Sequence, residues 1–487
     1  MAPTHTVRSY CRTCLAACGV LLDVQDDRVV RVQGDPEHPL SRGYSCPKGR
    51  AMGALQHHPD RLDHPWIREA TGKRRQVEWA AMMDDLTDRL ALLREEHGPG
   101  AVGIYIGTGG GYDSLGLAAA RGLQAMLPLP STYSAMTIDT PCLPLVSSLM
   151  SGSMVPNPVL DLEDVTLTLL LGTNPSVSHG HTTAWSDPTT MLRRLSGEGR
   201  ELWVADPRRT RTAKEATRYL PIRPSTDHAL LAHLVREVLG PEGGADRDFL
   251  VAHAMDVDRL EAAVAPWDRA RTSAETGLSE SHLRDLLASI RRHGRLVVMT
   301  GTGCSMQRHA NIIEWLSWSL QIATNSFEQP GGQWFHPGAS HRFEAMPAFD
   351  EPVFQGGAAS TARPGVPRHV GEMPCSVMAD EIASGNLRAL VVLGGDPLTA
   401  FPNAPRIRAA LESLEVLAVV DVVACRMTEI ATHGLPATAP LERFDVPGYM
   451  ESAQVTVVSQ IAKPVFAPST DCRGNRDFKL RFPHHRY

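Results

Sequence analysis

Four cysteines near the N-terminus have the residue type and the spacing of a metal centre. Three of them form the pattern C-x2-C-x3-C at Cys11, Cys14 and Cys18, and after 27 intervening residues Cys46 opens the run Cys-Pro-Lys-Gly. Four thiolates satisfy the ligand count of a cubane iron-sulfur cluster. A structural zinc site is the main alternative, but zinc sites favour paired C-x2-C knuckles. The spacing therefore predicts a 4Fe-4S cluster in preference to zinc or to unligated thiols.

The other cysteines do not indicate disulfide bonds. The chain has nine cysteines, an odd number, and those outside the cluster motif lie singly at positions 142, 304, 375, 425 and 472. A disulfide framework uses an even number of cysteines at close spacings. The distribution is therefore typical of a metal site and not of a disulfide-stapled protein.

Glycine-rich loops follow several apolar segments and have the composition of a dinucleotide site. The small residues at 172–175 would let the backbone approach a pyrophosphate. Asp206 ends the next apolar segment, where a carboxylate can accept hydrogen bonds from a ribose or a guanine, and Arg208 and Thr210 could meet phosphate. A glycine loop followed by an acid is the dinucleotide fingerprint. The alternative is that Asp206 and Asp227 only cap helices.

Alternating strands and helices would position these loops. Short apolar segments, each followed by a turn or a helical pattern, lie at 101–107, 166–172, 201–206, 295–301, 387–395 and 416–421. This alternation predicts an α/β fold with parallel sheets, whose working loops lie at the carboxyl ends of the strands. Residues 20–34 alternate apolar and polar side chains around two aspartates, which predicts a β-hairpin between the third and fourth clustered cysteines.

Composition and charge exclude some classes of protein function. The chain has 487 residues, 43% of them hydrophobic and 21% charged, which fits a folded globular protein of about three domains. The formal net charge of -6 gives no long-range field that would recruit nucleic acid. No run of about 18 apolar residues is present, and the opening residues contain neither an apolar signal core nor a twin-arginine pair. We therefore expect a cytoplasmic protein without a membrane span.

Taken together and in order, these motifs resemble those of the molybdopterin oxidoreductases of the dimethyl sulfoxide reductase and formate dehydrogenase superfamily. The resemblance covers residues 8–465 and rests on the Cys-Pro-Lys-Gly run and on LGTNPSVSHG at 171–180 paired with VADPRRTRTA at 204–213. GTGCSMQRH and LGGDPL follow in the expected order. The resemblance implies a 4Fe-4S cluster and molybdenum or tungsten bound by two molybdopterin guanine dinucleotides.

The resemblance also implies a domain organisation. A small N-terminal β-rich iron-sulfur domain would be followed by two doubly wound parallel-sheet, Rossmann-like cofactor domains. The expected division is 1–58 for the cluster domain, 59–133 with 335–470 for a discontinuous α/β domain, 134–334 for a second α/β domain, and 471–487 for a tail.

Single residues receive roles from the same resemblance. Lys48 would be an electron-transfer contact between the cluster and one pterin, and Asp227 would recognise the guanine base. The loops at 301–303 and 394–396, with Asp421, would form the second pterin half-site, whereas the glycines at 109–111 are left open between a turn and a substrate funnel. The expected cofactor-binding residues are Gly172, Asn174, Pro175, Ser178, Asp206, Arg208, Thr210, Asp227, Gly301, Thr302, Gly303, Gly394, Gly395, Asp396 and Asp421.

The side chain that completes the metal sphere in the family is not matched here. In residues 132–142 the family's cysteine or selenocysteine followed by histidine is absent, which argues against formate oxidation in particular. Asp139 ranks first as a hard oxygen ligand and Cys142 second as a soft anionic ligand. A metal without any protein ligand is the third alternative.

The predicted function is two-electron redox of a small substrate at molybdenum or tungsten, with electrons passing through a pterin and the cluster to a partner protein. The family normally continues into a C-terminal β-barrel domain of well over a hundred residues. Two alternatives stay open: a separate subunit supplies this domain and is a second expected partner, or the sequence is a truncated product that retains its cofactors poorly. Three alternatives stay open: a non-catalytic iron-sulfur subunit of a respiratory complex, a hydratase of the same superfamily, and a plain nucleotide-binding α/β protein with a zinc knuckle.

Overall fold

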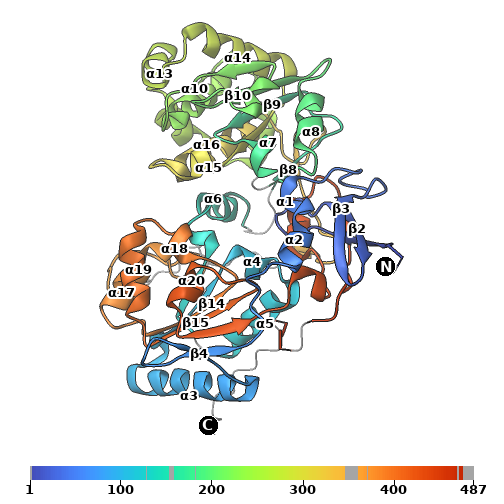
Figure 1. The fold of residues 1–487 in the computed structure, drawn as a ribbon. Coiled ribbons are helices and arrows are strands. Elements are labelled where there is room, and N and C mark those ends of the chain that lie inside the picture. Colours follow the sequence, from blue (N-terminus) through green and yellow to red (C-terminus); the bar gives the residue numbers. More distant parts are fainter. Residues whose placement is uncertain are drawn as a thin grey trace. The chain divides into compact units, whose positions relative to one another are not determined.

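The chain forms two compact units, whose helices and strands are labelled in Figure 1. The computed structural model describes residues 3–127, 129–152, 158–180, 183–345, 360–369, 371–468 and 471–474. The first unit comprises Met1–Ile138, Glu351–Gly448 and Gln460–Tyr487, and the second comprises Asp139–Asp350 and Tyr449–Ser459. In the described part of the chain, no helix is both long and apolar enough to cross a bilayer.

A three-stranded antiparallel sheet opens the first unit. Its strands are β1 (His5–Tyr10), β2 (Gly19–Gln25) and β3 (Arg28–Gly34), in that order. Asp26 and Asp27 between β2 and β3 both have positive φ, at 49° and 56°, which suits the tight turn of a hairpin. The predicted hairpin is confirmed. Its alternation buries Val20, Leu22 and Val24 in a small core and leaves the polar face outward.

The main sheet of the first unit has seven strands, in the order β5-β4-β16-β15-β14-β6-β7. The five strands from β16 to β7 are parallel, while β4 and β5 form an antiparallel edge. When the five parallel strands are numbered by their order in the chain, their order across the sheet from β7 to β16 is 2-1-3-4-5, which is a doubly wound arrangement. The strands are β4 (Trp66–Arg68), β5 (Arg74–Gln76), β6 (Val102–Ile106), β7 (Ser131–Ser134), β14 (Ala389–Leu393), β15 (Val416–Asp421) and β16 (His433–Pro436).

Helices cover both faces of this sheet. One face packs against α3, whose buried Leu86, Leu90 and Leu93 recur at helical spacing. The other face packs against α17 and α19. The helices of the unit are α1 (Pro47–Arg50), α2 (Met52–Gln56), α3 (Trp79–His97), α4 (Thr108–Gly111), α5 (Ser114–Met126), α17 (Met378–Ala383), α18 (Pro397–Ala400), α19 (Ala404–Glu412) and α20 (Arg426–Ile430).

The second unit is built on a four-stranded, fully parallel sheet in the order β11-β10-β9-β12. When these strands are numbered by their order in the chain, their order across the sheet from β11 to β12 is 3-2-1-4, which is the order of a Rossmann half. They are β9 (Leu167–Leu171), β10 (Glu201–Ala205), β11 (Arg218–Leu220) and β12 (Val297–Thr300), and a separate antiparallel pair joins β8 (Pro158–Leu160) and β13 (Gln333–Phe335). The predicted α/β class with a small N-terminal β domain is therefore confirmed.

Helices also lie on both faces of the second sheet. The larger core lies between the sheet and α10, α14 and α16, and α8 covers the opposite face. α14 shows why a helix forms here: Ser279 accepts from the His282 N–H at its start, and Gly294 follows its end with φ 74°. The helices are α6 (Cys142–Ser151), α7 (Pro175–Ser178), α8 (Pro188–Leu195), α9 (Arg211–Lys214), α10 (Asp227–Leu239), α11 (Arg247–His253), α12 (Val257–Val264), α13 (Arg269–Thr276), α14 (Glu280–His293), α15 (Thr302–Ser305) and α16 (Ala310–Ala323).

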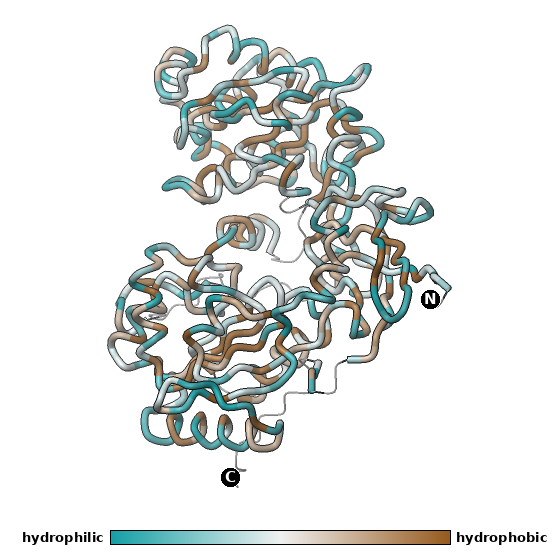
Figure 2. Tube along the Cα trace, viewed as in Figure 1, coloured by the Kyte–Doolittle hydropathy of each residue, from teal (hydrophilic) through white to brown (hydrophobic). Residues whose placement is uncertain are grey.

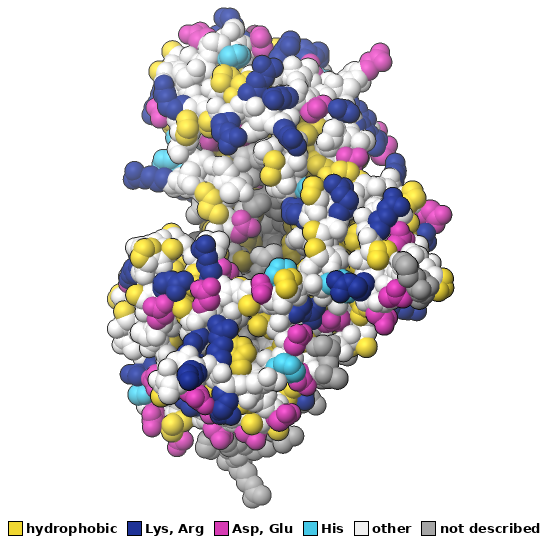
Figure 3. All heavy atoms as spheres, in the orientation of Figure 1, with side chains coloured by type: hydrophobic (Ala, Val, Ile, Leu, Met, Phe, Trp, Pro, Cys, Tyr) yellow, Lys and Arg dark blue, Asp and Glu magenta, His cyan; other side chains and the backbone are white. Residues whose placement is uncertain are grey.

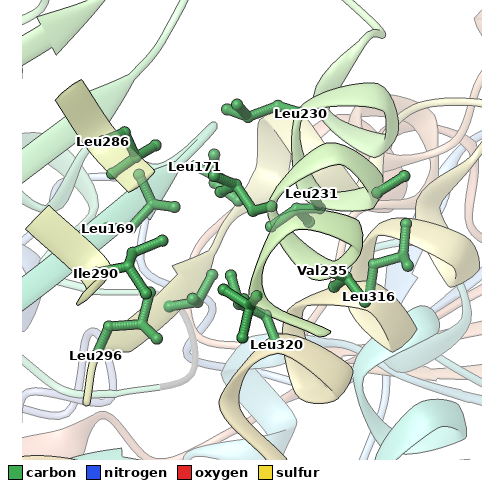
Figure 4. Close-up of a cluster of buried hydrophobic side chains, with 14 of the residues drawn as sticks. Leu169, Leu171, Leu230, Leu231, Val235, Leu286, Ile290, Leu296, Leu316 and Leu320 are labelled. Carbon is green, nitrogen blue, oxygen red and sulfur yellow. The ribbon is translucent and has the colours of Figure 1, made fainter. Parts of the chain in front are cut away.

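The apolar interior of each unit contrasts with a mixed surface. Figure 2 shows apolar strands at the centre of each unit, and the face drawn in Figure 3 carries acidic and basic side chains together. Figure 4 shows the larger core of the second unit, where side chains from the sheet and three helices pack together, among them Leu169, Leu171, Leu230, Leu231, Val235, Leu286, Ile290, Leu316 and Leu320.

Removing one side chain from this core tests the packing. Leu231 is fully buried, so Leu231→Ala should lower the free energy of unfolding of the second unit by about 2–5 kcal/mol through lost burial and a residual cavity. Val251 is 89% exposed, and Val251→Ala should change stability by less than about 0.5 kcal/mol. Urea unfolding of both variants provides the measurement, and equal stabilities would contradict the described core.

Candidate cofactor sites

The four N-terminal cysteines come from two short loops of the first unit. The loop between β1 and β2 carries three of them and is closed by the Cys11 N–H, which donates to the Cys18 carbonyl at 2.8 Å. A positive φ of 44° at Ala17 turns the chain back toward β2. Cys46 directly precedes α1, where Pro47 occupies the first helical position. Two tight turns therefore hold the four thiols.

The environment of these thiols fits a bound metal. Cys18 interacts electrostatically with the three other cysteines, and burial raises the pKa of Cys11, Cys14 and Cys18. Buried thiols of raised pKa become thiolates only when a metal replaces the proton. The preference for a cubane cluster over a single ion rests on the spacing of the cysteines.

Backbone groups complete the surroundings of the thiols. The N–H groups of Thr13 and Ala16 hydrogen-bond the sulfurs of Cys11 and Cys14 and lower their pKa values, against the larger effect of burial. Gly49 lies so close that a Cβ there would be 3.4 Å from the Cys11 sulfur. The glycine of the Cys-Pro-Lys-Gly run therefore leaves room for the cluster loop.

Lys48 lies on the same side of the first unit as the thiols. Its side chain is exposed on α1, and its positive charge lowers the pKa of Cys14. This places a cation beside the candidate cluster. Its role as an electron-transfer contact stays a prediction.

Two glycine loops meet at the carboxyl edge of the first unit's sheet, between β6 and β14. The Gly109 N–H donates to the Gly394 carbonyl at 2.9 Å, and the Gly107 N–H donates to the Leu393 carbonyl at 2.9 Å. Gly394 has a φ of 56°, and a Cβ on Gly107 would lie 2.4 Å from the Cα of Gly395. Any larger side chain would drive the loops apart. The strand order reverses here, which is where doubly wound folds bind ligands.

Two further glycine loops meet in the same way in the second unit, between β9 and β12. The Gly303 N–H donates to the Gly172 carbonyl at 2.8 Å, and Gly172 has a φ of 55°. A Cβ on Gly172 would lie 2.9 Å from the Cys304 nitrogen, and one on Gly301 would lie 2.4 Å from the Cβ of Thr173. This junction also lies where the strand order reverses.

The two junctions share sequence as well as geometry. Gly-Thr-Gly occurs at 107–109 and again at 301–303, and Leu-Gly-x-x-Pro occurs at 171–175 and again at 393–397. The N–H groups of Gly172 and Gly394 each donate to the strand that follows in the chain, to Ala205 at 3.1 Å and to Val420 at 3.0 Å. Asp206 and Asp421 come directly after those two acceptors. The protein therefore contains the same two-loop junction twice.

Within each unit the loops pair in a way that differs from the grouping expected from the sequence. The loop at 301–303 was expected to join the loop at 394–396 in one half-site, but the first belongs to the second unit and the second to the first unit. Each loop packs against another partner: 301–303 against 172–175, and 394–396 against 107–111. Sequence reasoning missed 107–109 as a junction loop, although the repeated Gly-Thr-Gly was the signal that could have found it.

The junctions leave backbone donors available on one side. The N–H groups of Thr173 and Asn174, and those of Gly395 and Asp396, take no part in the hydrogen bonds of the described loops. Each pair follows a glycine with positive φ, a backbone form that gathers N–H groups around an anion. Both junctions therefore fit the phosphates of a dinucleotide.

Asp227 is the predicted base contact most closely tied to a junction. It is buried at the start of α10, and burial raises its pKa. The Gln307 side-chain amide donates both to Asp227, at 3.0 Å, and to the Gly303 carbonyl, at 2.8 Å. The Asp227 carboxylate is thus held beside the second unit's junction, and it does not cap the helix.

Other predicted residues have structural partners. Thr210 caps α9 by accepting from the Ala213 N–H at 3.2 Å, and Asp396 caps α18 by accepting from the Leu398 N–H at 3.0 Å. Asp206 accepts from the Arg208 N–H at 2.8 Å. Asn174 accepts a hydrogen bond from Thr212, Ser178 donates to the Asn174 carbonyl, and Asp421 accepts from the Val422 N–H. Pro175 is buried at the start of α7, whereas Arg208 and Thr302 are exposed.

The two candidate metal ligands lie in different environments of the second unit. Asp139 is exposed. Cys142 is buried at the start of α6, where burial first and then the nearby Glu314 raise its pKa to about 11. Ser305 hydrogen-bonds the Cys142 sulfur. These contacts account for Cys142 as a packing residue, and metal ligation by either side chain stays a prediction.

Two family models match nearly the whole chain. Residues 61–477 match the molybdopterin oxidoreductase family, and residues 4–58 match its Fe4S4 domain. The chain belongs to the molybdopterin oxidoreductase family. The 4–58 match covers β1 to β3 and all four clustered cysteines, which agrees with the predicted cluster.

Relatives in the family are similar along most of this chain. A nitrate reductase of Symbiobacterium thermophilum is 26% identical over 91% of this chain and 61% of its own length. The alpha subunit of the F420-dependent formate dehydrogenase of Methanocaldococcus jannaschii is 21% identical over 90% of this chain and 64% of its own length. This chain therefore spans less than two thirds of these relatives.

A solved structure shares the fold. The acetylene hydratase of Pelobacter acetylenicus superimposes with a TM-score of 0.81 over 97% of this chain and 68% of its own, at 18% sequence identity. At this identity the likeness shows the fold alone.

A small cavity of mixed lining lies beside Thr300 and Glu314 in the second unit. Glu314 of α16 accepts from the Thr300 hydroxyl at 2.6 Å and from the Trp318 indole N–H at 3.2 Å, and forms no ion pair within the described residues. The cavity beside it leaves about 30 Å³ for the centres of water-sized molecules, enough for one or two waters. Burial raises the pKa of Glu314 to about 7, although both hydrogen bonds lower it.

Because the pKa of Glu314 is raised in the folded chain, the free energy of unfolding should depend on pH in a definite direction. Between pH 4.5 and 7 the folded chain keeps a proton on Glu314 that the unfolded chain has lost, so stability falls as pH rises. Glu314→Gln should remove this component, on the order of 3 kcal/mol across the window. Glu198, exposed in a loop of the same unit, gives the control Glu198→Gln. Urea unfolding from pH 4.5 to 7.5 compares them, and parallel profiles for wild type and Glu314→Gln would refute the prediction.

Proposed function

We propose that this chain is the catalytic core of a molybdenum or tungsten oxidoreductase that carries two molybdopterin guanine dinucleotides and a 4Fe-4S cluster. The observation that carries the proposal is the repeated two-loop junction, once in each unit, together with the four-thiol site. One junction alone would fit any mononucleotide-binding α/β protein. Two junctions with the same glycine motifs fit a cofactor that is bound as a pair.

The residues of the junctions would bind and orient the cofactor. The N–H groups of Thr173 and Asn174, and those of Gly395 and Asp396, would donate to the two pyrophosphates. Asp227 would accept from the donors on the edge of a guanine, with Gln307 holding its carboxylate in place. Asp206 and Asp421 end equivalent strands and would accept from ribose hydroxyls.

The chemistry of the reaction would come from the bound groups. When bound, a molybdenum or tungsten pterin supplies two-electron redox, and a 4Fe-4S cluster carries single electrons. Lys48 would hold a positive charge on the path beside Cys14, and the Thr13 and Ala16 N–H groups would stabilise the cluster thiolates. An electron-transfer partner protein is part of the proposal, because one relative is named as a subunit of a larger enzyme.

Elemental and nucleotide analysis tests this proposal on protein purified without oxygen. About four irons, one molybdenum or tungsten and two released guanine nucleotides per chain would support it. Zinc as the sole metal would exclude the cluster, and iron without the heavier metal or nucleotide would favour an electron-transfer subunit. Product formation that does not depend on an electron acceptor would favour a hydratase.

A single glycine substitution should remove one cofactor without removing the cluster. Gly172→Ala would place a methyl group 2.9 Å from the Cys304 nitrogen and open the second unit's junction, so about half of the guanine nucleotide should be lost while iron is retained. Gly199 also has positive φ, at 72°, but a Cβ there meets no neighbour within 4 Å. Gly199→Ala therefore reproduces the backbone strain alone and should keep both nucleotides. Equal nucleotide content in the two variants would argue against the junction as a binding site.

A further inference from the structure

Arg12 carries a buried positive charge inside the cluster loop. It lies between two predicted ligands, Cys11 and Cys14, and its side chain is 1% exposed. The guanidinium lies over the Tyr10 ring at 4.8 Å and donates to the Pro440 carbonyl at 2.6 Å. A charge buried this deeply is costly unless an opposite charge compensates it.

The compensating charge comes from a segment distant in sequence. Asp445 is fully buried, with one carboxylate oxygen 3.4 Å from the Arg12 Nε and 3.2 Å from the Arg443 Nε. Its other oxygen accepts from the Ser114 N–H at 3.1 Å and from the Ser114 hydroxyl at 2.6 Å. Asp445 therefore joins the cluster loop to the start of α5.

The network continues to the first unit's junction. Arg443 donates to the Tyr112 carbonyl at 3.2 Å and lies 3.7 Å from Asp113. Asp113 caps α5 by accepting from the Gly116 N–H at 2.9 Å, and its own N–H donates to the Gly110 carbonyl at 3.2 Å. An alternating chain of charges thus runs from the cluster loop to the Gly-Thr-Gly loop. We call Arg12, Asp445, Arg443 and Asp113 the charge chain.

Among these four residues, Arg12 is the one that lies within the cluster loop itself. It directly follows Cys11 in the chain, and its charge is buried there. In a low-dielectric interior a nearby positive charge favours the state of the cluster that holds one more electron. Asp445 opposes this effect, because it is the negative charge paired with Arg12.

We propose that Arg12 is a positioning residue that raises the reduction potential of the cluster, that Asp445 counteracts it, and that the charge chain ties the cluster loop to the first unit's junction. The inference rests on the proposed 4Fe-4S cluster. It assigns residues outside the four ligands and Lys48 to the control of electron transfer. It also gives a physical path by which the cluster loop and a cofactor loop are held in fixed register.

Three variants of the whole chain test the electrostatic part. Arg12→Gln should shift the cluster's midpoint potential downward, Asp445→Asn should shift it upward, and Arg12→Lys should stay near wild type. Arg8 lies four residues away, is 61% exposed and pairs with Asp35 and Glu37, so Arg8→Gln is the matched control and should leave the potential unchanged. Redox titration followed by electron paramagnetic resonance measures each midpoint, with iron per chain counted on the same samples.

The outcomes separate this inference from the proposed function. Opposite shifts in Arg12→Gln and Asp445→Asn support it, because loosening of the loop alone would move both variants in one direction. Shifts of the same sign, or none, in iron-loaded samples would overturn the inference and leave the cluster intact. A wild-type chain that binds no iron would overturn both.

Hydrogen exchange tests the structural part without relying on the cluster. Arg12→Gln should speed amide exchange in residues 108–116, which the charge chain holds through Tyr112, Asp113 and Ser114, and Arg8→Gln should not. Unchanged exchange in residues 108–116 of Arg12→Gln would overturn the proposed tie between the two loops.

Discussion

Contact between backbones at the carboxyl edge of each sheet is the constraint on which the rest of the structure depends. At both junctions the loops approach so closely that a single Cβ would clash, and backbone N–H to carbonyl hydrogen bonds hold each pair of loops together. The parallel strands bring these loop ends together, and the helices that pack on both faces of each sheet hold the strands in place. The backbone N–H groups that directly follow Gly172 and Gly394 take no part in these contacts between the loops.

Burial of charge is the second organising force, and it acts mainly in the first unit. Thiols, guanidinium groups and carboxylates that would each be unfavourable alone are placed where they compensate one another or a bound metal. Asp445 illustrates this, because five separate groups, including Arg12 and Arg443, converge on its carboxylate. Segments hundreds of residues apart in sequence are fixed to each other by such contacts.

Local signals in the sequence predicted the parts of the structure that depend on local physics. The hairpin followed from alternation around Asp26 and Asp27, the α/β class from the recurrence of apolar segments, and the cluster motif from cysteine spacing. The pairing of loops could not be predicted in this way, because strand order is decided by tertiary packing. The packing of 301–303 against 172–175 and of 394–396 against 107–111 therefore had no local signal, and neither had the buried partner of Arg12, more than 400 residues away.

The two loops of each junction occur in opposite order along the chain. In the first unit the Gly-Thr-Gly loop, after β6, comes before the Leu-Gly-x-x-Pro loop, after β14. In the second unit the Leu-Gly-x-x-Pro loop, after β9, comes before the Gly-Thr-Gly loop, after β12. The parallel arrays β16-β15-β14-β6 and β11-β10-β9-β12 nevertheless match strand for strand. At the level of these strands, one unit is a circular permutant of the other. The site therefore belongs to the arrangement of strands in space and not to the order in which the chain supplies them.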